Sequence, residues 1–142
     1  MTKNKISVKN RYTGKVIIEG EFESIKELLE KNRESNLSLC DLSRCDLFRS
    51  DLYGCNLSGC NLSWCNLSMS NLSWCDLSRC DLFRSDLSGC NLSWCNLSGC
   101  DLSGCDLSGC DLSGANLSGS KIKISQQENL IKSLGIIVEE EK

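Results

Sequence analysis

The sequence predicts an all-β solenoid, a chain that winds into a coil of short sides and stacks each coil on the one before. Three observations predict it. Residues 35–124 read as eighteen consecutive five-residue units without an insertion, leucine occupies the centre of the first seventeen, and Asp or Asn precedes each of those leucines. Internal repetition of this kind indicates a repeat architecture before any other feature is weighed.

The five-residue period excludes both a helix and a flat strand. In an α-helix each residue advances by about 100°, so leucines five apart spread around the axis and form no apolar face. In a flat strand the side chains alternate between faces, so successive leucines would point to opposite sides. The leucines can share one interior only if the chain turns a corner in every unit. Asp, Asn, Ser and Gly at fixed offsets supply the turn chemistry for those corners.

The units resemble the pentapeptide-repeat family, whose signature is A-(D/N)-L-x-x. Ala115-Asn116-Leu117-Ser118-Gly119 matches that signature letter for letter. The resemblance implies a right-handed quadrilateral β-helix with four units per coil, in which the central leucine and the residue two before it point inward. Eighteen units would then form about four and a half coils. At about 4.8 Å per stacked strand the rod would be about 22 Å long.

Cysteine replaces the family's usual alanine at the first inward position, and all twelve cysteines lie there. A coil of twenty residues stacks these cysteines in columns, so we expect all twelve, and all the central leucines, to be buried. Buried free cysteine behaves as a small polarizable hydrophobe, and core packing is therefore the favoured interpretation. The predicted core positions on one side of the coil are Cys40, Cys60, Cys80, Cys100, Leu42, Leu62, Leu82 and Leu102.

Two other interpretations of the cysteines are weaker. A thiolate metal ladder or a redox store lacks both C-x-x-C spacing and histidine, which is absent from the chain. A disulfide within a column would strain the coil, because stacked side chains lie about 4.8 Å apart and a bridge needs Cβ atoms about 3.8 Å apart. The sequence therefore predicts reduced thiols, no metal site and no cofactor.

Residues 1–34 predict a cap made of a hairpin and a helix. The β-rich runs Ile6-Ser7-Val8 and Val16-Ile17-Ile18 are separated by polar residues, which is typical of a hairpin. Ser24 begins a capping-box sequence and opens an amphipathic helix that extends to about Asn32. This helix is expected to cover the open first coil, whose apolar side chains and strand edges would otherwise be exposed.

Residues 125–142 predict a second cap, and all three parts are expected to form one structural domain. Ser125-Gln126-Gln127-Glu128 reads as a second capping box, and Gly135 is placed to close the helix. An apolar stripe of Leu130, Ile131 and Leu134 precedes the short strand candidate Ile136-Ile137-Val138. Because this tail is more apolar than a plug requires, either a monomer or a homodimer formed through the C-terminal end is predicted.

Five outward residues are the least explained by turn or core needs: Arg44, Trp64, Arg84, Trp74 and Trp94. With four units per coil, Trp74 and Trp94 stack on one side, while the other three alternate as arginine, tryptophan and arginine on another. These columns either stabilise the ladder locally, through cation–π contacts, or form a surface for an unidentified protein partner. Both interpretations stay open at the level of sequence.

The composition argues against catalysis. Histidine, the commonest general base, is absent, and the serines have no plausible base beside them, so no catalytic residue is predicted. The sequence instead favours a non-enzymatic rigid scaffold or protein-interaction module. The family resemblance adds an alternative, because members that confer quinolone resistance are thought to mimic DNA with an acidic solenoid that engages a type II topoisomerase such as gyrase. Residues 35–119 are mildly acidic, with nine Asp and four Arg.

Charge and hydropathy set the remaining expectations. A formal charge of only −3 with no polybasic run favours no direct nucleic-acid binding. The chain has no apolar stretch of about 18 residues and begins with polar, charged residues, so neither a membrane span nor a signal peptide is expected. The cytoplasm is the predicted location.

Overall fold

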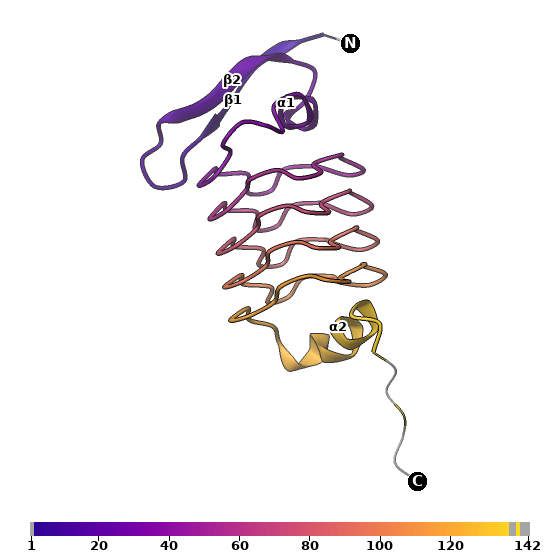
Figure 1. Ribbon diagram of the computed structural model, residues 1–142. Coiled ribbons are helices and arrows are strands. Elements are labelled where there is room, and N and C mark those ends of the chain that lie inside the picture. Colours follow the sequence, from indigo (N-terminus) through magenta and orange to yellow (C-terminus); the bar gives the residue numbers. More distant parts are fainter. Residues whose placement is uncertain (1, 137–138, 140–142) are drawn as a thin grey trace.

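The computed structural model describes residues 2–136 and 139, and its elements follow one axis (Figure 1). A two-stranded antiparallel sheet, β1 (Asn4–Lys9) and β2 (Val16–Phe22), is followed by helix α1 (Ile25–Lys31). Stacked coils come next. The chain then enters a 3₁₀ turn, η1 (Ile124–Gln126), and ends its regular structure in helix α2 (Gln127–Ser133).

The predicted hairpin is present and joins the first coil directly. Val8 pairs with Ile18, and the register shifts by one residue between Val8 and Lys9. Beyond that shift the chain leaves β2 for the coil: Asn10 forms an antiparallel bridge with Cys40, and the Lys9 carbonyl accepts a hydrogen bond from Asp41 N at 2.8 Å. The hairpin therefore supplies backbone partners to one side of the first coil.

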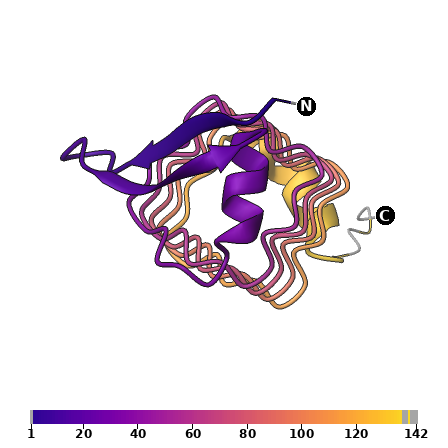
Figure 2. The same ribbon diagram turned by 90° about the horizontal axis from the view of Figure 1, so that it is seen from above.

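Helix α1 lies across the mouth of the coils (Figure 2). The Ser24 hydroxyl accepts from Glu27 N at 3.2 Å, as predicted, but the Glu27 carboxylate accepts from Glu23 N rather than from the Ser24 amide. Leu28 and Leu29 are fully buried and belong to the common core. Burial of two leucines contributes about 2–3 kcal/mol each, which is what holds so short a helix in place.

The coils are built from parallel bridges between residues twenty apart, beginning with Asn36 and Asn56. Each coil is therefore four five-residue units. At one such rung Leu42 N donates to Asn61 O at 2.8 Å, and Asn61 N donates to Cys40 O at 2.9 Å. Between rungs the carboxylate or amide oxygen of Asp or Asn accepts from the backbone amide two residues later, so these residues shape the corners.

The interior follows the predicted columns, with three exceptions at the ends. Eleven of the twelve cysteines are buried, but Cys45 is only half-buried. Cys45 lies in the first coil, where no coil stacks above it, whereas Cys40 in the same coil is covered by its bridge to Asn10. Leu117 and Ile122 are half-buried for the corresponding reason, because they belong to the last, incomplete coil.

The C-terminal end differs from its prediction. Ser125 caps nothing, because the chain enters through η1 and α2 begins at Gln127 without a side-chain cap. Gln126 turns inward and is buried, Leu130 packs against the core, and Gly135 adopts φ 72° after the helix. The predicted strand at Ile136–Val138 lies mostly outside the described residues. Among residues 2–136 and 139, neither helix has the length and apolar character of a bilayer span.

Candidate functional site

The last residue of each five-residue unit, here called the corner position, has left-handed backbone. Glycine occupies eight of the seventeen corner positions and adopts φ near +70° at each. The other nine carry side chains at φ 54–61°: Leu39, Arg44, Arg49, Trp64, Met69, Trp74, Arg79, Arg84 and Trp94. A side chain in this region costs about 1–2 kcal/mol, and such outliers concentrate at functional sites. All five outward residues singled out from the sequence are corner residues.

Three of those five form one continuous line of contacts. The guanidinium carbon of Arg44 lies 5.8 Å from the centre of the Trp64 ring, and that of Arg84 lies 5.0 Å from it on the following coil. Arg84 also lies 5.3 Å from the ring of Phe83, over which the Lys123 ammonium sits at 5.9 Å. We call these five residues the cation–aromatic column. It runs from the first coil to the beginning of η1.

The other two form the tryptophan pair. The rings of Trp74 and Trp94 are stacked, with centroids 5.5 Å apart and an interplanar angle of 16°. Each side chain remains 58% exposed. Trp94 lies over Gly114, where a Cβ would come within 2.6 Å of its ring, so glycine at that corner makes room for the indole.

The cation–aromatic column and the tryptophan pair do not form one patch. Trp64 and Trp74 are two units apart, which is half of a twenty-residue coil, so the two features lie on opposite sides of the rod. A single partner that contacted both would have to wrap around the coil. The structure thus holds two separate candidate surfaces.

The buried thiols take part in the hydrogen bonding between stacked coils. On nine of the eleven, Sγ lies 2.6–3.0 Å from a leucine carbonyl of the preceding coil, as for Cys60 and Leu37 O at 3.0 Å or Cys80 and Leu57 O at 2.9 Å. Burial raises the pKa of the Cys65 and Cys95 thiols to about 12. A protonated thiol is the form that can donate to a carbonyl, so the thiols act as hydrogen-bond donors as well as packing groups.

Metal ligation finds no support in the geometry. Within residues 2–136 and 139, no three side chains of His, Cys, Asp or Glu are grouped closely enough to hold an ion. The raised pKa of thiols such as Cys65 and Cys95 opposes formation of the thiolate, which a soft metal would require.

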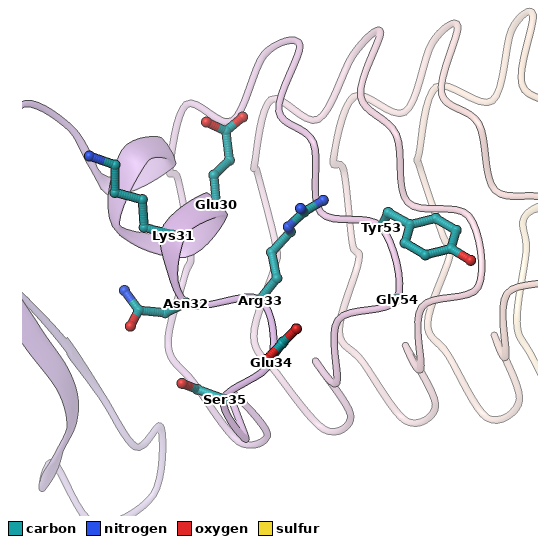
Figure 3. A pocket seen from close by; sticks show the side chains of 8 residues that line it. All are labelled: Glu30, Lys31, Asn32, Arg33, Glu34, Ser35, Tyr53 and Gly54. Atoms are coloured by element: carbon teal, nitrogen blue, oxygen red, sulfur yellow. The ribbon is translucent and has the colours of Figure 1, made fainter.

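Two of the depressions on the surface of the described residues are large enough to consider as sites. One, of about 590 Å³, lies between the end of α1 and the corner of the first coil at Tyr53 and Gly54 (Figure 3). Its lining mixes both charges, and Arg33 is neutralised by Asp51 at 2.9 Å. The other, of about 520 Å³, is lined mainly by serines around Gly59 and Arg79. Neither contains a nucleophile beside a base, and neither includes the cation–aromatic column or the tryptophan pair.

Two polar residues at the ends of the rod were not predicted. The Glu30 carboxylate accepts from Asp51 N at 2.8 Å, in the place of a carbonyl from a preceding coil. Gln126 Oε1 accepts from Gly104 N at 2.9 Å, while its Nε2 donates to Leu102 O at 2.8 Å and Cys105 O at 2.9 Å. A signal for Gln126 was present, because it occupies the register of the Asp or Asn in the next unit.

Phe83 and Lys123 were also not predicted to belong to a candidate binding surface. Phe83 stands where most units have serine, and that substitution was visible in the sequence. Its edge-to-face contact with Trp64, at 6.3 Å and 77°, depends on the coil period and becomes evident only in three dimensions. Lys123 belongs to the eighteenth unit and lies 40 residues, or two coils, after Phe83, so the repeat register was a signal for the alignment of these two side chains.

Known proteins support the architecture. Rfr23, a pentapeptide repeat protein from the cyanobacterium Cyanothece 51142, is 30% identical over 62% of this chain and 60% of its own, with a TM-score of 0.61. HetL, a pentapeptide repeat protein involved in heterocyst differentiation regulation in the cyanobacterium Nostoc sp. strain PCC 7120, is 31% identical over 66% of this chain and 44% of its own, with a TM-score of 0.62. Both likenesses thus cover less than two thirds of the relative.

A third solved structure is QnrB1, a plasmid-mediated fluoroquinolone resistance protein. It is 29% identical over 70% of this chain and 65% of its own, but its TM-score of 0.28 carries no argument. No functionally curated protein matches the sequence. The profile of pentapeptide repeats matches residues 33–63, 45–82, 55–93 and 85–123, which together are more than half of the chain. The protein is therefore a right-handed β-helix solenoid and belongs to the pentapeptide-repeat family.

Proposed function

We propose that this chain is a non-enzymatic scaffold that binds a protein partner through side chains at its corner positions. The observation that carries the proposal is the backbone conformation there. Eight corners hold glycine, so the coil forms without corner side chains, yet nine corners keep them at φ 54–61°. Their conformational cost, about 1–2 kcal/mol each, is not required by the fold. A recognition role accounts for that cost.

The identity of the side chains supports the same conclusion. Tryptophan and arginine are enriched among residues that dominate binding energy at protein interfaces. Here they supply seven of the nine occupied corners. Trp64, Trp74 and Trp94 are each about half exposed, although a large apolar side chain gains most when it is buried. A partner that covered them would bury that area.

The ends of the molecule complete the scaffold in this proposal. The hairpin and α1 cap one end of an about four-and-a-half-coil rod, and η1 with α2 caps the other, so that the whole chain is one structural domain. Glu30 and Gln126 support this role, since each provides partners that a neighbouring coil would otherwise supply. Exposed Leu134 and Ile136 at the C-terminal end support a homodimer formed there as the alternative to a monomer. A reducing cytoplasm suits the twelve free thiols.

Affinity capture with matched variants tests the proposal. The binding variant replaces Trp64, Trp74 and Trp94 with glycine, the residue already found at equivalent corners. The control variant makes the same change at Leu39 and Met69. We expect a stoichiometric partner to be retained by the wild type and the control and lost by the tryptophan variant, with all three showing the same circular dichroism. Retention of the partner by the tryptophan variant would contradict the proposal.

A supercoiling assay with DNA gyrase tests the alternative function, in which the chain mimics DNA. Mimicry of DNA depends on the aspartates and not on the tryptophans. Inhibition by the wild type and the tryptophan variant alike, weakened by added salt, would therefore replace the corner-binding proposal with acidic mimicry.

A further inference from the structure

We propose that the cation–aromatic column is a docking site for an extended acidic segment of a protein partner. This inference deepens the proposed function and rests on it. The column consists of Arg44, Trp64, Arg84, Phe83 and Lys123, and it is one of the two candidate surfaces described above.

Within residues 2–136 and 139, the cations of the column form no ion pair with a carboxylate. The ion pairs among the described residues involve Lys5, Lys31, Arg33 and Lys132, and none involves Arg44, Arg84 or Lys123. The two guanidinium groups instead contact ring faces, at 5.0–5.8 Å from the Trp64 centre. Contact through a ring face leaves the in-plane N–H donors of a guanidinium available, and that edge matches a carboxylate in two-point geometry.

The charge of this side of the coil differs from that of the other three. It carries Arg44, Arg84, Lys121 and Lys123 against Asp41, Asp81 and Asp101, for a net charge of +1. Two other sides of the rod are each −2, and the fourth is neutral. An acidic ligand is therefore attracted to this side and repelled from the two sides of charge −2, which favours both its association rate and its choice of side.

The spacing selects an extended ligand. Arg44 and Arg84 are two coils apart, and Lys123 follows about two coils after Arg84. At about 4.8 Å per coil, neighbouring cations stand about 10 Å apart along the axis. Residues i and i+3 of an extended polyproline II segment are about 9 Å apart and point to the same side, because that conformation has three residues per turn and a rise of about 3.1 Å per residue. A segment of this kind with an acidic residue at every third position, lying along the rod, therefore meets all three cations.

A nucleic acid fits this surface less well. Single strands bind proteins by stacking bases on exposed aromatic faces. The Trp64 indole is contacted by a guanidinium from the coil before and another from the coil after, so neither ring face is open to a base. The three aspartates on the same side also oppose a continuous phosphate backbone, whereas separate carboxylates spaced three residues apart can avoid them.

Trp64 can report binding directly. In a background that replaces Trp74 and Trp94 with phenylalanine, Trp64 is the only tryptophan of the chain. The probe is a ten-residue peptide with glutamate at every third position and serine elsewhere. Its controls are a peptide with lysine in place of glutamate and a single-stranded DNA decamer. We expect saturable fluorescence change with the acidic peptide alone, weakened by salt.

A matched pair of charge variants locates the site. Arg44→Gln/Arg84→Gln removes two charges from the column, and Arg49→Gln/Arg79→Gln removes two from other sides of the rod. We expect the first variant to weaken peptide binding by at least about tenfold and the second by less than about twofold, as measured by calorimetry. Equal losses in both variants, tighter binding of the DNA, or no saturable binding up to about 1 mM peptide would each overturn the inference. If the capture experiment still finds a tryptophan-dependent partner, the proposed function survives that failure.

Discussion

The two halves of the rod share one interior but differ on the outside. From Leu39 to Trp94, nine of twelve corner positions carry side chains, while from Gly99 to Gly119 all five carry glycine. Inside, the leucines and cysteines of both halves are buried, apart from Cys45 in the first coil and the residues of the last coil. The second half shows that the coil closes without corner side chains. The first half therefore adds corner side chains to the same scaffold, and we expect partner recognition at those side chains.

High pH should have the largest effect, and it should act on both halves together. The buried Cys100 and Cys110 thiols have their pKa raised to about 12, and Cys105 has its pKa raised to about 11, because burial disfavours the thiolate. Below about pH 8.5 both the folded and unfolded states are protonated. Above it only the unfolded state loses the protons, so stability falls by about 1.4 kcal/mol per pH unit for each such thiol, until the folded pKa is reached.

We therefore expect one cooperative unfolding transition above about pH 9, followed by circular dichroism under reducing conditions. Replacing Cys60, Cys80 and Cys100 with alanine removes three of the linked groups and should move the midpoint to higher pH. Two separate transitions would show that the halves do not share one interior. An unchanged midpoint in the alanine variant would show that the thiols do not drive the transition.

Loss of the Gln126 amide should have the next largest effect on stability, confined to the half of the rod whose corners all carry glycine. Gln126→Met keeps the volume but leaves Gly104 N, Leu102 O and Cys105 O without their partners. Because an unsatisfied buried polar group costs about 1–3 kcal/mol, we expect unfolding in urea to show a loss of about 3 kcal/mol. Gln127→Met, one residue later on an exposed part of α2, is the control and should change stability by less than about 0.5 kcal/mol. Equal effects of the two changes would argue against the inward role of Gln126.

Exchanges at the corners should have the smallest effect and opposite signs in the two halves. Gly109→Ala places a Cβ at φ 67° with only ordinary contacts around it, so we expect it to destabilise by about 1 kcal/mol. Arg79→Gly removes a side chain at φ 59° that contacts no aromatic ring within the described residues, and it should stabilise by a similar amount. Thermal unfolding measures both. A destabilising Arg79→Gly would mean that corner side chains support the coil after all.

The repeat carried most of the information about the fold, because leucine spacing, turn residues and the period all point to one coil. The columns of Arg44, Trp64 and Arg84 and of Trp74 and Trp94 followed from that period and are confirmed as contacts. Their left-handed backbone was not foreseen, since tryptophan and arginine have no preference for it. It emerges because every unit must turn the same way, whichever residue stands at the corner.

The ends of the rod were harder to predict, because there the repeat no longer constrains the chain. Cys45 and Leu117 follow the pattern and yet are half-buried, since burial in a stack depends on what lies above and below. Ser125 has the composition of a cap, but the unmet hydrogen bonds of the last coil attract Gln126 instead. The repeat register marked the position of Gln126, but no local pattern indicated which backbone groups it would reach.

The placement of Gln126 in the repeat register links the length of the rod to the angle between its ends. Hydrogen bonds join Gln126 to residues 102–105, one coil earlier, and join Glu30 and Arg33 to Asp51 in the first coil. Inserting or deleting twenty residues would return every side to its original direction. A change by a number of units that is not a multiple of four would turn the C-terminal helix relative to the hairpin, by about a quarter revolution per unit. Chain length in such a molecule thus sets the relative orientation of its two ends. A partner that contacted both ends could distinguish a rod lengthened by four units, which keeps that orientation, from a rod lengthened by five units, which changes it.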